Sequence, residues 1–176
     1  CQCPACKAKG VSNGWFRTGE QNSFRHATGF AVEEGATLEF GRSADYAAPI
    51  TGAGTLRLSG AGAFNLTGDL SGFAGQWSTY VANVDFSNVP SATSSLDVGN
   101  GGFATFHDDV SLAALSGQGL LGGVALPDGK TLTVSGANNA EFAGRLVGAG
   151  KLVKNGAGTL TLSGDSEFAE VDVRSG

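Results

Sequence analysis

The chain has 176 residues, of which 41% are hydrophobic, enough for one domain with a buried core or for one segment of a longer repeat array. The formal net charge of −5 argues against nucleic-acid binding and against docking on anionic membranes, because both require a basic face. The 29 glycines follow no G-X-Y period, which excludes collagen, and no apolar run is long enough for a transmembrane helix.

All the cysteines lie at the start of the chain, as Cys1, Cys3 and Cys6. Three thiolates at this spacing could hold a soft metal, but neither His26 nor His107 has the spacing of a fourth ligand. An odd number of thiols outside the cell instead points to an intermolecular crosslink, and a mature chain that starts at Cys points to a lipid anchor. A chain boundary without a role is the remaining alternative. We favour a crosslink or an anchor, and expect no metal and no cofactor.

The first part of the chain, residues 1–30, is rich in aromatic residues and lacks the pattern that follows it. Those aromatic residues are Trp15, Phe16, Phe24 and Phe30. Repeat arrays need capped ends, since an open end exposes strand edges and apolar side chains. We therefore expect an N-terminal cap or docking segment over 1–30 and one repeat domain over 31–176.

Short stretches in the repeat domain alternate polar residues with Leu, Val or Phe, which is typical of half-buried strands. The alternation predicts strands at 37–40, 55–58, 83–86, 95–98, 131–134 and 159–162. Asn-Gly pairs at 100–101 and 155–156, and Ser-Gly pairs after several strands, predict the turns between them. We expect an all-β fold without long helices.

One of these strands is written twice. GAGTLRLSG at 52–60 and GAGTLTLSG at 156–164 differ only where Arg57 stands in the first copy and Thr161 in the second. Internal repetition favours a parallel β-solenoid of about seven or eight coils over a sandwich, although periodicity alone does not separate the two. Identical residues then meet identical surroundings in different coils. The residues that define the repeat are Gly52, Gly54, Leu56, Leu58 and Gly60, and Gly156, Gly158, Leu160, Leu162 and Gly164.

Acid–base chemistry has one candidate, the run Phe106-His107-Asp108-Asp109. Cleavage of a glycosidic bond needs two carboxylates that face the same substrate, whereas adjacent residues of a strand point to opposite faces. We interpret the run as a polar turn and expect no catalytic site. Trp15, Trp77 and Tyr80 are candidate platforms on which sugar rings could stack, although packing in the core or the cap is the better interpretation of Trp15, which lies beside Phe16.

The second copy resembles a repeat of a known protein family. Residues 154–164 closely resemble the passenger-associated transport repeat of bacterial autotransporters, and residues 142–153 fit the usual lead-in to that repeat. Phe168 and Glu170 depart from the pattern, which more often has Tyr and Gly there. The resemblance implies a right-handed parallel β-helix that is secreted or displayed on the surface of a Gram-negative-type bacterium.

The last residues, 171–176, break off inside the repeat pattern without a polar cap. We expect this end to associate with another subunit, as a head-to-tail contact that generates fibres, or with the next coil of a longer chain. The function that we expect is therefore that of a non-catalytic structural rod that stacks end to end. The alternative is an adhesin-like module that binds carbohydrate or host surfaces. A polysaccharide-degrading β-helix enzyme is the third reading, and it would need a groove of converging carboxylates.

Overall fold

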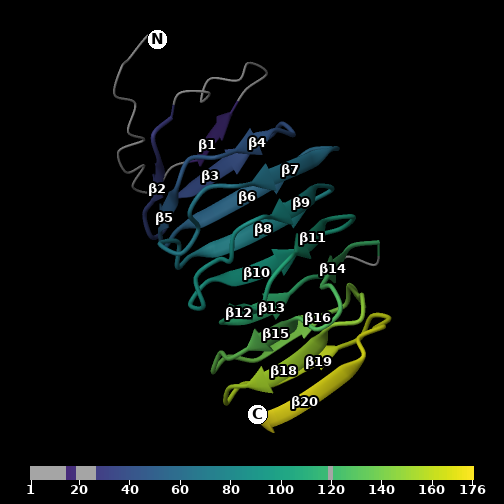
Figure 1. Cartoon of the computed structure of the whole chain (residues 1–176). Helices are drawn as coiled ribbons and strands as arrows, with labels where there is room; N and C mark the ends of the chain where they lie inside the picture. The colour runs from purple at the N-terminus through teal and green to yellow at the C-terminus, as the bar shows by residue number, and fades with distance from the viewer. Residues whose placement is uncertain (1–14, 19–26, 119–120) are drawn as a thin grey trace.

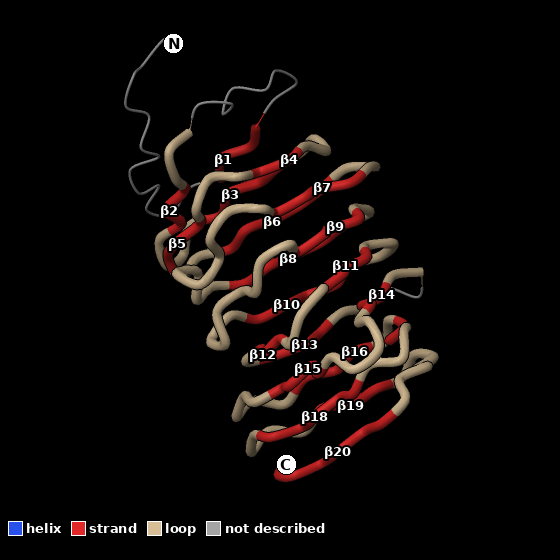
Figure 2. The backbone as a smooth tube through the Cα atoms, in the orientation of Figure 1, coloured by secondary structure: helices blue, strands red, loops and turns tan. Residues whose placement is uncertain are grey.

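The computed structural model describes the backbone of residues 15–18 and all atoms of residues 27–118 and 121–176. Its twenty strands wind into a parallel β-solenoid of about seven turns, and no helix occurs in these ranges (Figures 1 and 2). The described part of the chain therefore has no helix that could cross a membrane. The predicted all-β solenoid is confirmed, and the sandwich alternative is wrong because the strands pair in parallel from coil to coil.

The strands form three long faces, which each coil crosses in turn. Face 1 contains β1 (Trp15–Thr18), β3 (Thr37–Phe40), β6 (Thr55–Ser59), β8 (Gln76–Tyr80), β10 (Ser95–Val98), β13 (Ala114–Ser116), β16 (Ala140–Phe142) and β19 (Leu160–Leu162). Face 2 contains β4 (Asp45–Tyr46), β7 (Ala63–Leu66), β9 (Asn83–Phe86), β11 (Phe103–Phe106), β14 (Gly123–Ala125) and β17 (Arg145–Val147). Face 3 contains β2 (Phe30–Val32), β5 (Ile50–Gly52), β12 (Val110–Leu112), β15 (Thr131–Val134), β18 (Lys151–Asn155) and β20 (Glu170–Ser175).

The core is a set of vertical stacks in which one inward side chain lies on its equivalent in the next coil. On face 1, parallel register aligns a stack whose members are at most 6% exposed: Leu38, Leu56, Trp77, Leu96 and Leu115. On face 2, the rings of Phe86 and Phe106 stack with centroids 4.7 Å apart. Burial of one such side chain contributes roughly 1.5–3 kcal/mol, so the repeated stacks hold the coils together.

The duplicated nine-residue sequence has a structural cause. Its first copy forms β6 and its second forms β19, and both strands lie on face 1, as Figure 1 shows. Leu56 and Leu58 are completely buried, whereas Leu160 and Leu162 are partly buried in the last described coil. The sequence is therefore repeated because the two strands occupy equivalent positions on the same face of the solenoid in different coils.

The glycines of the motif lie where backbones of neighbouring coils touch. A Cβ atom would come within 2.3 Å of a backbone carbonyl oxygen at Gly54, Gly156, Gly158 and Gly164. Any side chain larger than hydrogen would force the coils apart there, because this distance is far shorter than a van der Waals contact. The close packing of the corners explains why the motif needs glycine.

Val81 is the exception at these corners. It is the sole non-glycine residue of the described ranges with a positive φ, 55°, and it is 46% exposed. This left-handed conformation costs an L-residue roughly 1–2 kcal/mol, and β-branched side chains tolerate it least. At the same corner in neighbouring coils, positive φ belongs to Gly60 and Gly101.

We expect Val81→Gly to raise the free energy of unfolding by about 1 kcal/mol, because the strain removed exceeds the added freedom of the unfolded chain. Val89→Gly is the matched control, since Val89 is 41% exposed and has no positive φ. The control is expected to lose about 0.5–1 kcal/mol. Chemical denaturation measures both, and a loss of stability in both variants would show that Val81 is not strained.

Candidate functional site

Polar side chains form ladders on the outer surface of face 2. Asp45, Asn65 and Asp85 are in register on β4, β7 and β9, and Asn65 Nδ2 donates a hydrogen bond of 2.5 Å to Asp45 Oδ1. His107 Nε2 lies 2.8 Å from Asp85 Oδ2. Such hydrogen bonds join residues 19 to 23 positions apart in the sequence, which is one coil. The ladders therefore tie each coil to the next.

The candidate acid–base run lies in the turn after β11. His107 contacts Asp85 through the hydrogen bond described above. The Asp108 carboxylate accepts a 2.8 Å hydrogen bond from Lys130 Nζ. This hydrogen bond lowers the pKa of Asp108 and raises the pKa of Lys130. Asp109 Oδ1 accepts the backbone N–H of residue 131 at 2.8 Å. The three side chains turn to three separate partners on neighbouring coils, as in the polar turn expected from the sequence.

Metal binding has no support in the part of the chain that the structure describes. No group of three or more His, Cys, Asp or Glu residues within 27–118 and 121–176 could hold an ion. The thiols Cys1, Cys3 and Cys6 and the imidazole of His26 lie outside the described residues, so the crosslink or anchor stays a prediction. The cap predicted over 1–30 also stays a prediction, although β1 within it pairs in parallel with β3.

Of the three candidate sugar platforms, the side chain of Trp15 lies outside the described residues, and Trp77 and Tyr80 differ in exposure. Trp77 is completely buried, with its ring 4.6 Å from that of Phe73 and 5.3 Å from that of Phe86, so its assignment as a platform is wrong. Alternation within β8 could have indicated this, because Trp77 occupies an inward position between two polar neighbours. Tyr80, at the end of β8, is 45% exposed, and the guanidinium carbon of Arg57 lies 5.5 Å from its ring centroid.

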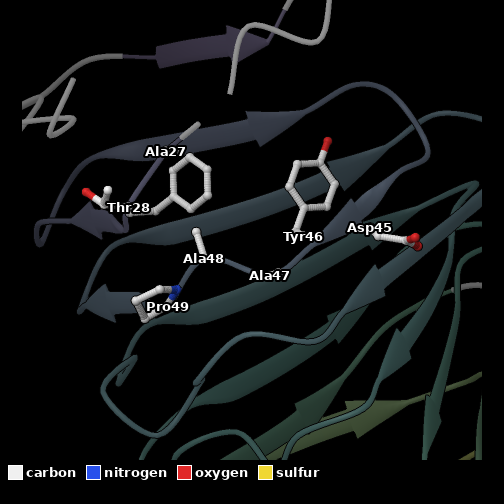
Figure 3. Close-up of a pocket in the computed structure, with 8 residues that line it drawn as sticks. Ala27, Thr28, Asp45, Tyr46, Ala47, Ala48 and Pro49 are labelled. Carbon is white, nitrogen blue, oxygen red and sulfur yellow. The ribbon is translucent and has the colours of Figure 1, made fainter. Parts of the chain in front are cut away.

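A cavity of about 300 Å³ lies beside β4 near the N-terminal end of the described solenoid. Its lining residues, drawn in Figure 3, are Ala27, Thr28, Phe30, Asp45, Tyr46, Ala47, Ala48 and Pro49. The Tyr46 ring stacks on that of Phe40 with centroids 4.0 Å apart, its hydroxyl donates to the Arg42 carbonyl, and burial raises its pKa. Asp45 already accepts from Asn65. The cavity is therefore lined mainly by small side chains and two aromatic rings, and its one carboxylate already has a hydrogen-bond partner.

The opposite end of the solenoid is apolar. Val171 and Val173 on β20 are 54% and 64% exposed, and they border a cavity of about 130 Å³. Its lining residues are Leu152, Lys154, Thr159, Leu160, Leu162, Val171, Val173 and Gly176. We call this surface, formed by β19, β20 and the cavity between them, the C-terminal face. Strand edges and inward-type side chains are therefore exposed in the last described coil, where a further coil of the same chain or of another copy would cover them.

Charges surround the C-terminal face on the outer surface of face 3. Lys151 Nζ lies 2.7 Å from Glu170 Oε1 and 3.5 Å from Asp172 Oδ2, and Arg174 Nε lies 3.0 Å from the same Asp172 oxygen. The hydrogen bond from Arg174 is the main cause of the lowered pKa of Asp172, and the hydrogen bond to Glu170 raises the pKa of Lys151. The two pairs of Lys151 join β18 to β20, whereas the Arg174–Asp172 pair lies within β20, and none of them covers the apolar face.

Comparison with known proteins gives two matches. Residues 152–176 match the family model described as Passenger-associated-transport-repeat. The Adhesin BmaC autotransporter of Brucella suis biovar 1 (strain 1330) is 36% identical over 114 residues, which make up 64% of this chain and 3% of that protein. The chain thus spans a small fraction of the length of this relative. No solved structure matches significantly.

Proposed function

We propose that this chain, a stretch of autotransporter passenger β-solenoid with passenger-associated transport repeats, is a non-catalytic structural rod that stacks end to end through its C-terminal face. The resemblance seen in the sequence is confirmed by the family match and by the related autotransporter. The same similarity indicates a secreted or surface-displayed protein of a Gram-negative bacterium.

The observation that supports the proposal is the way in which coils dock on one another, through inward stacks that continue from strand to strand. Val171 continues the inward stack of Leu132 and Leu152, both of which are at most 1% exposed, yet Val171 itself is 54% exposed. A further coil, whether of the same chain or of a second copy, would bury Val171, Val173 and the edge of β20 in the way that every earlier coil is buried. The outer surfaces, by contrast, carry polar ladders that are satisfied within the rod.

Negative-stain electron microscopy of the chain, with and without reductant, tests the stacking. We expect rods longer than one solenoid, and shortening by reductant would assign Cys1, Cys3 and Cys6 to a crosslink between subunits. The comparison with and without reductant also tests the proposal that residues 1–30 form a docking segment. Uniform single particles in both conditions would overturn the structural rod.

A substitution makes the same test quantitative. Val171→Asn is expected to weaken association about 5- to 150-fold, because docking would bury an amide without hydrogen-bond partners, at a cost of about 1–3 kcal/mol. Val89→Asn is the matched control, since Val89 is an exposed valine on a lateral corner. Sedimentation velocity compares the two, and equal association would show that copies do not meet at the C-terminal face.

Adhesion is the second candidate function, and the name of the relative, an adhesin, is the observation that favours it. Of the candidate platforms whose side chains the structure describes, Tyr80, exposed beside Arg57, is the one that a sugar could reach. Binding of the chain to a glycan array, lost in Tyr80→Ala, would support a carbohydrate-binding passenger. Absence of binding to glycans and to host cells would leave the structural role.

A further inference from the structure

Two Asn-Gly pairs of the repeat domain lie at corners of the solenoid, at residues 100–101 and 155–156. In such a pair, the backbone nitrogen of the glycine can attack the side-chain carbonyl carbon of the asparagine and close a cyclic imide. Glycine favours this reaction because it has no Cβ to obstruct the approach and adopts backbone conformations that other residues avoid. In a folded chain, the attack depends on the freedom of the peptide unit between the two residues.

Asn100 and Gly101 form the centre of a tight turn between β10 and β11, on the corner that also contains Val81. The N–H of Gly102 donates to the carbonyl oxygen of Gly99 at 3.0 Å, and the φ angle of Gly101 is 71°. Because Asn100 itself has no positive φ, this is the geometry of a type II turn, in which asparagine and glycine are the two central residues. The side chain of Asn100 is exposed there.

The peptide unit that joins Asn100 to Gly101 is lightly held. Its carbonyl oxygen accepts a hydrogen bond from the N–H of Val81 at 3.2 Å. The side-chain amide of Asn100 has no hydrogen-bond partner in the part of the chain that the structure describes. Among the described residues, a Cβ atom on Gly101 would meet one atom within 4 Å, the Cα of Val81 at 3.9 Å. Rotation of this peptide unit toward the asparagine side chain therefore breaks the hydrogen bond to Val81 and meets open space.

The peptide unit between Asn155 and Gly156 is enclosed instead. A Cβ atom on Gly156 would lie 2.3 Å from the carbonyl oxygen of Ser135 and 2.4 Å from that of Gly136, so the backbone of the preceding coil lies directly against it. The carbonyl oxygen of Gly156 also accepts a hydrogen bond from Lys154 Nζ at 2.6 Å. Rotation there would require the two coils to separate. The same pair of residues is therefore free to react at one corner and protected at the other.

We propose that Asn100 is a site of spontaneous deamidation through attack by the backbone nitrogen of Gly101. The bond that forms joins Gly101 N to Asn100 Cγ, and the bond that breaks is Cγ–Nδ2, so that ammonia leaves with the proton of the Gly101 amide. Water then opens the cyclic imide at one of its two carbonyl carbons. One opening leaves an aspartyl residue at position 100, and the other leaves an isoaspartyl residue, in which the backbone runs through Cβ and Cγ. Nothing is oxidised or reduced, and water is the co-reactant.

The products change both the charge and the length of the chain at this corner. Each product adds a negative charge, and the isoaspartyl form lengthens the backbone between Gly99 and Gly102 by one carbon atom. The coil leaves no room for a longer chain, because a Cβ on Gly99 would lie 2.8 Å from the carbonyl oxygen of Thr79 and one on Gly102 would lie 2.5 Å from Thr79 Oγ1. Deamidation is therefore expected to loosen this corner from the preceding coil. Because the loss of ammonia is irreversible, the fraction of loosened rods rises with the age of the protein.

The test follows both pairs in the folded full chain by mass spectrometry of proteolytic peptides. The chain is incubated at neutral and at mildly alkaline pH, and the replacement of NH2 by OH raises the mass of each peptide that has reacted. Position 100 is expected to react at least about 10-fold faster than position 155, because breaking one more hydrogen bond in the transition state changes a rate by about that factor. In denaturant the two rates are expected to converge. Alkaline pH is expected to speed both reactions, since the attacking nitrogen must lose its proton.

Asn100→Gln is the matched variant, because glutamine keeps the amide but would have to close a larger and less favourable ring. This variant is expected to lose no ammonia at position 100. Its midpoint of chemical denaturation is expected to stay constant during the incubation, whereas the midpoint of the parent chain falls.

Three outcomes overturn the proposal or its consequence. If position 100 stays intact in the folded chain although it reacts in denaturant, the turn protects Asn100 and the proposal falls. If position 155 reacts as fast as position 100 in the folded chain, the packing of the corners does not control the reaction. If the midpoint of Asn100→Gln falls as much as that of the parent chain, the loosening does not arise from deamidation at this corner.

Discussion

Replacement of Gly52 by alanine is expected to lower the free energy of unfolding by at least about 3 kcal/mol. The new Cβ would lie 2.1 Å from the carbonyl oxygen of Val32 and 2.7 Å from its carbonyl carbon, and the backbone φ of Gly52 is +107°. Overpacking and a strained backbone each cost about 1–3 kcal/mol, and here both arise at one atom. Val32 cannot retreat without breaking its pairing with Gly52 in the β2–β5 ladder.

Gly129→Ala is the matched control for Gly52→Ala. Gly129 also has a positive φ, +72°, but a Cβ there would meet no atom within 4 Å. This variant therefore isolates the conformational strain, about 1–2 kcal/mol, from the collision between coils. Guanidinium denaturation followed by far-ultraviolet circular dichroism measures both. Equal losses in the two variants would show that close packing of the corner is not what requires Gly52.

Alternation and repetition are local signals, so the sequence predicted the strands and favoured a solenoid, whereas the parallel pairing of the strands was needed to exclude a sandwich. The pattern at 55–58 predicts a strand with Leu56 and Leu58 inward, and the structure buries both completely. Recurrence of the pattern at 159–162 predicts an equivalent place, and β19 lies on the same face as β6. Glycine at fixed positions of the motif marks the corners where backbones touch.

Other features depend on which residues of different coils meet, and local patterns do not encode this. The polar turn at His107, Asp108 and Asp109 was predictable, but its partners Asp85 and Lys130 follow only from the register of the coils. The burial of Lys154 on β18, which is 6% exposed, was missed for a different reason. Alternation through β18 puts Leu152 and the residue two positions later inward, but the usual expectation that lysine is exposed outweighs that signal.

The buried Trp77 was likewise misjudged, and its replacement has the second large expected effect. Trp77→Ala is expected to cost about 3–5 kcal/mol, the usual range when a fully buried aromatic side chain is truncated. The side chain lies in the stack between Leu56 and Leu96, and its ring makes edge-to-face contacts with Phe73 and Phe86. Loss of the ring therefore removes contacts to the coil above, to the coil below and across the core.

Each coil of a solenoid contacts only its neighbours. The cavity that Trp77→Ala would leave in the middle coils is therefore expected to divide the rod into two units that unfold separately. Denaturation of Trp77→Ala should then be broader than that of the parent chain, with a lower m value. Tyr80→Ala, on the same strand but 45% exposed, should change stability by no more than about 1 kcal/mol. A sharp single transition in Trp77→Ala would show that the coils fold as one cooperative unit.

Trp77→Leu separates the size of the side chain from its polarity. Leucine is the residue at this position in the coils on either side, so the variant restores the uniform stack at Leu56 and Leu96. It also removes the indole N–H, a buried group that has no hydrogen-bond partner in the described part of the chain. Trp77→Ala removes the same unsatisfied donor, so the two variants differ only in the volume that leucine fills, and Trp77→Leu should be clearly more stable than Trp77→Ala. If the two variants were equally unstable, the aromatic contacts with Phe73 and Phe86, rather than the filling of the stack, would determine the stability of these middle coils.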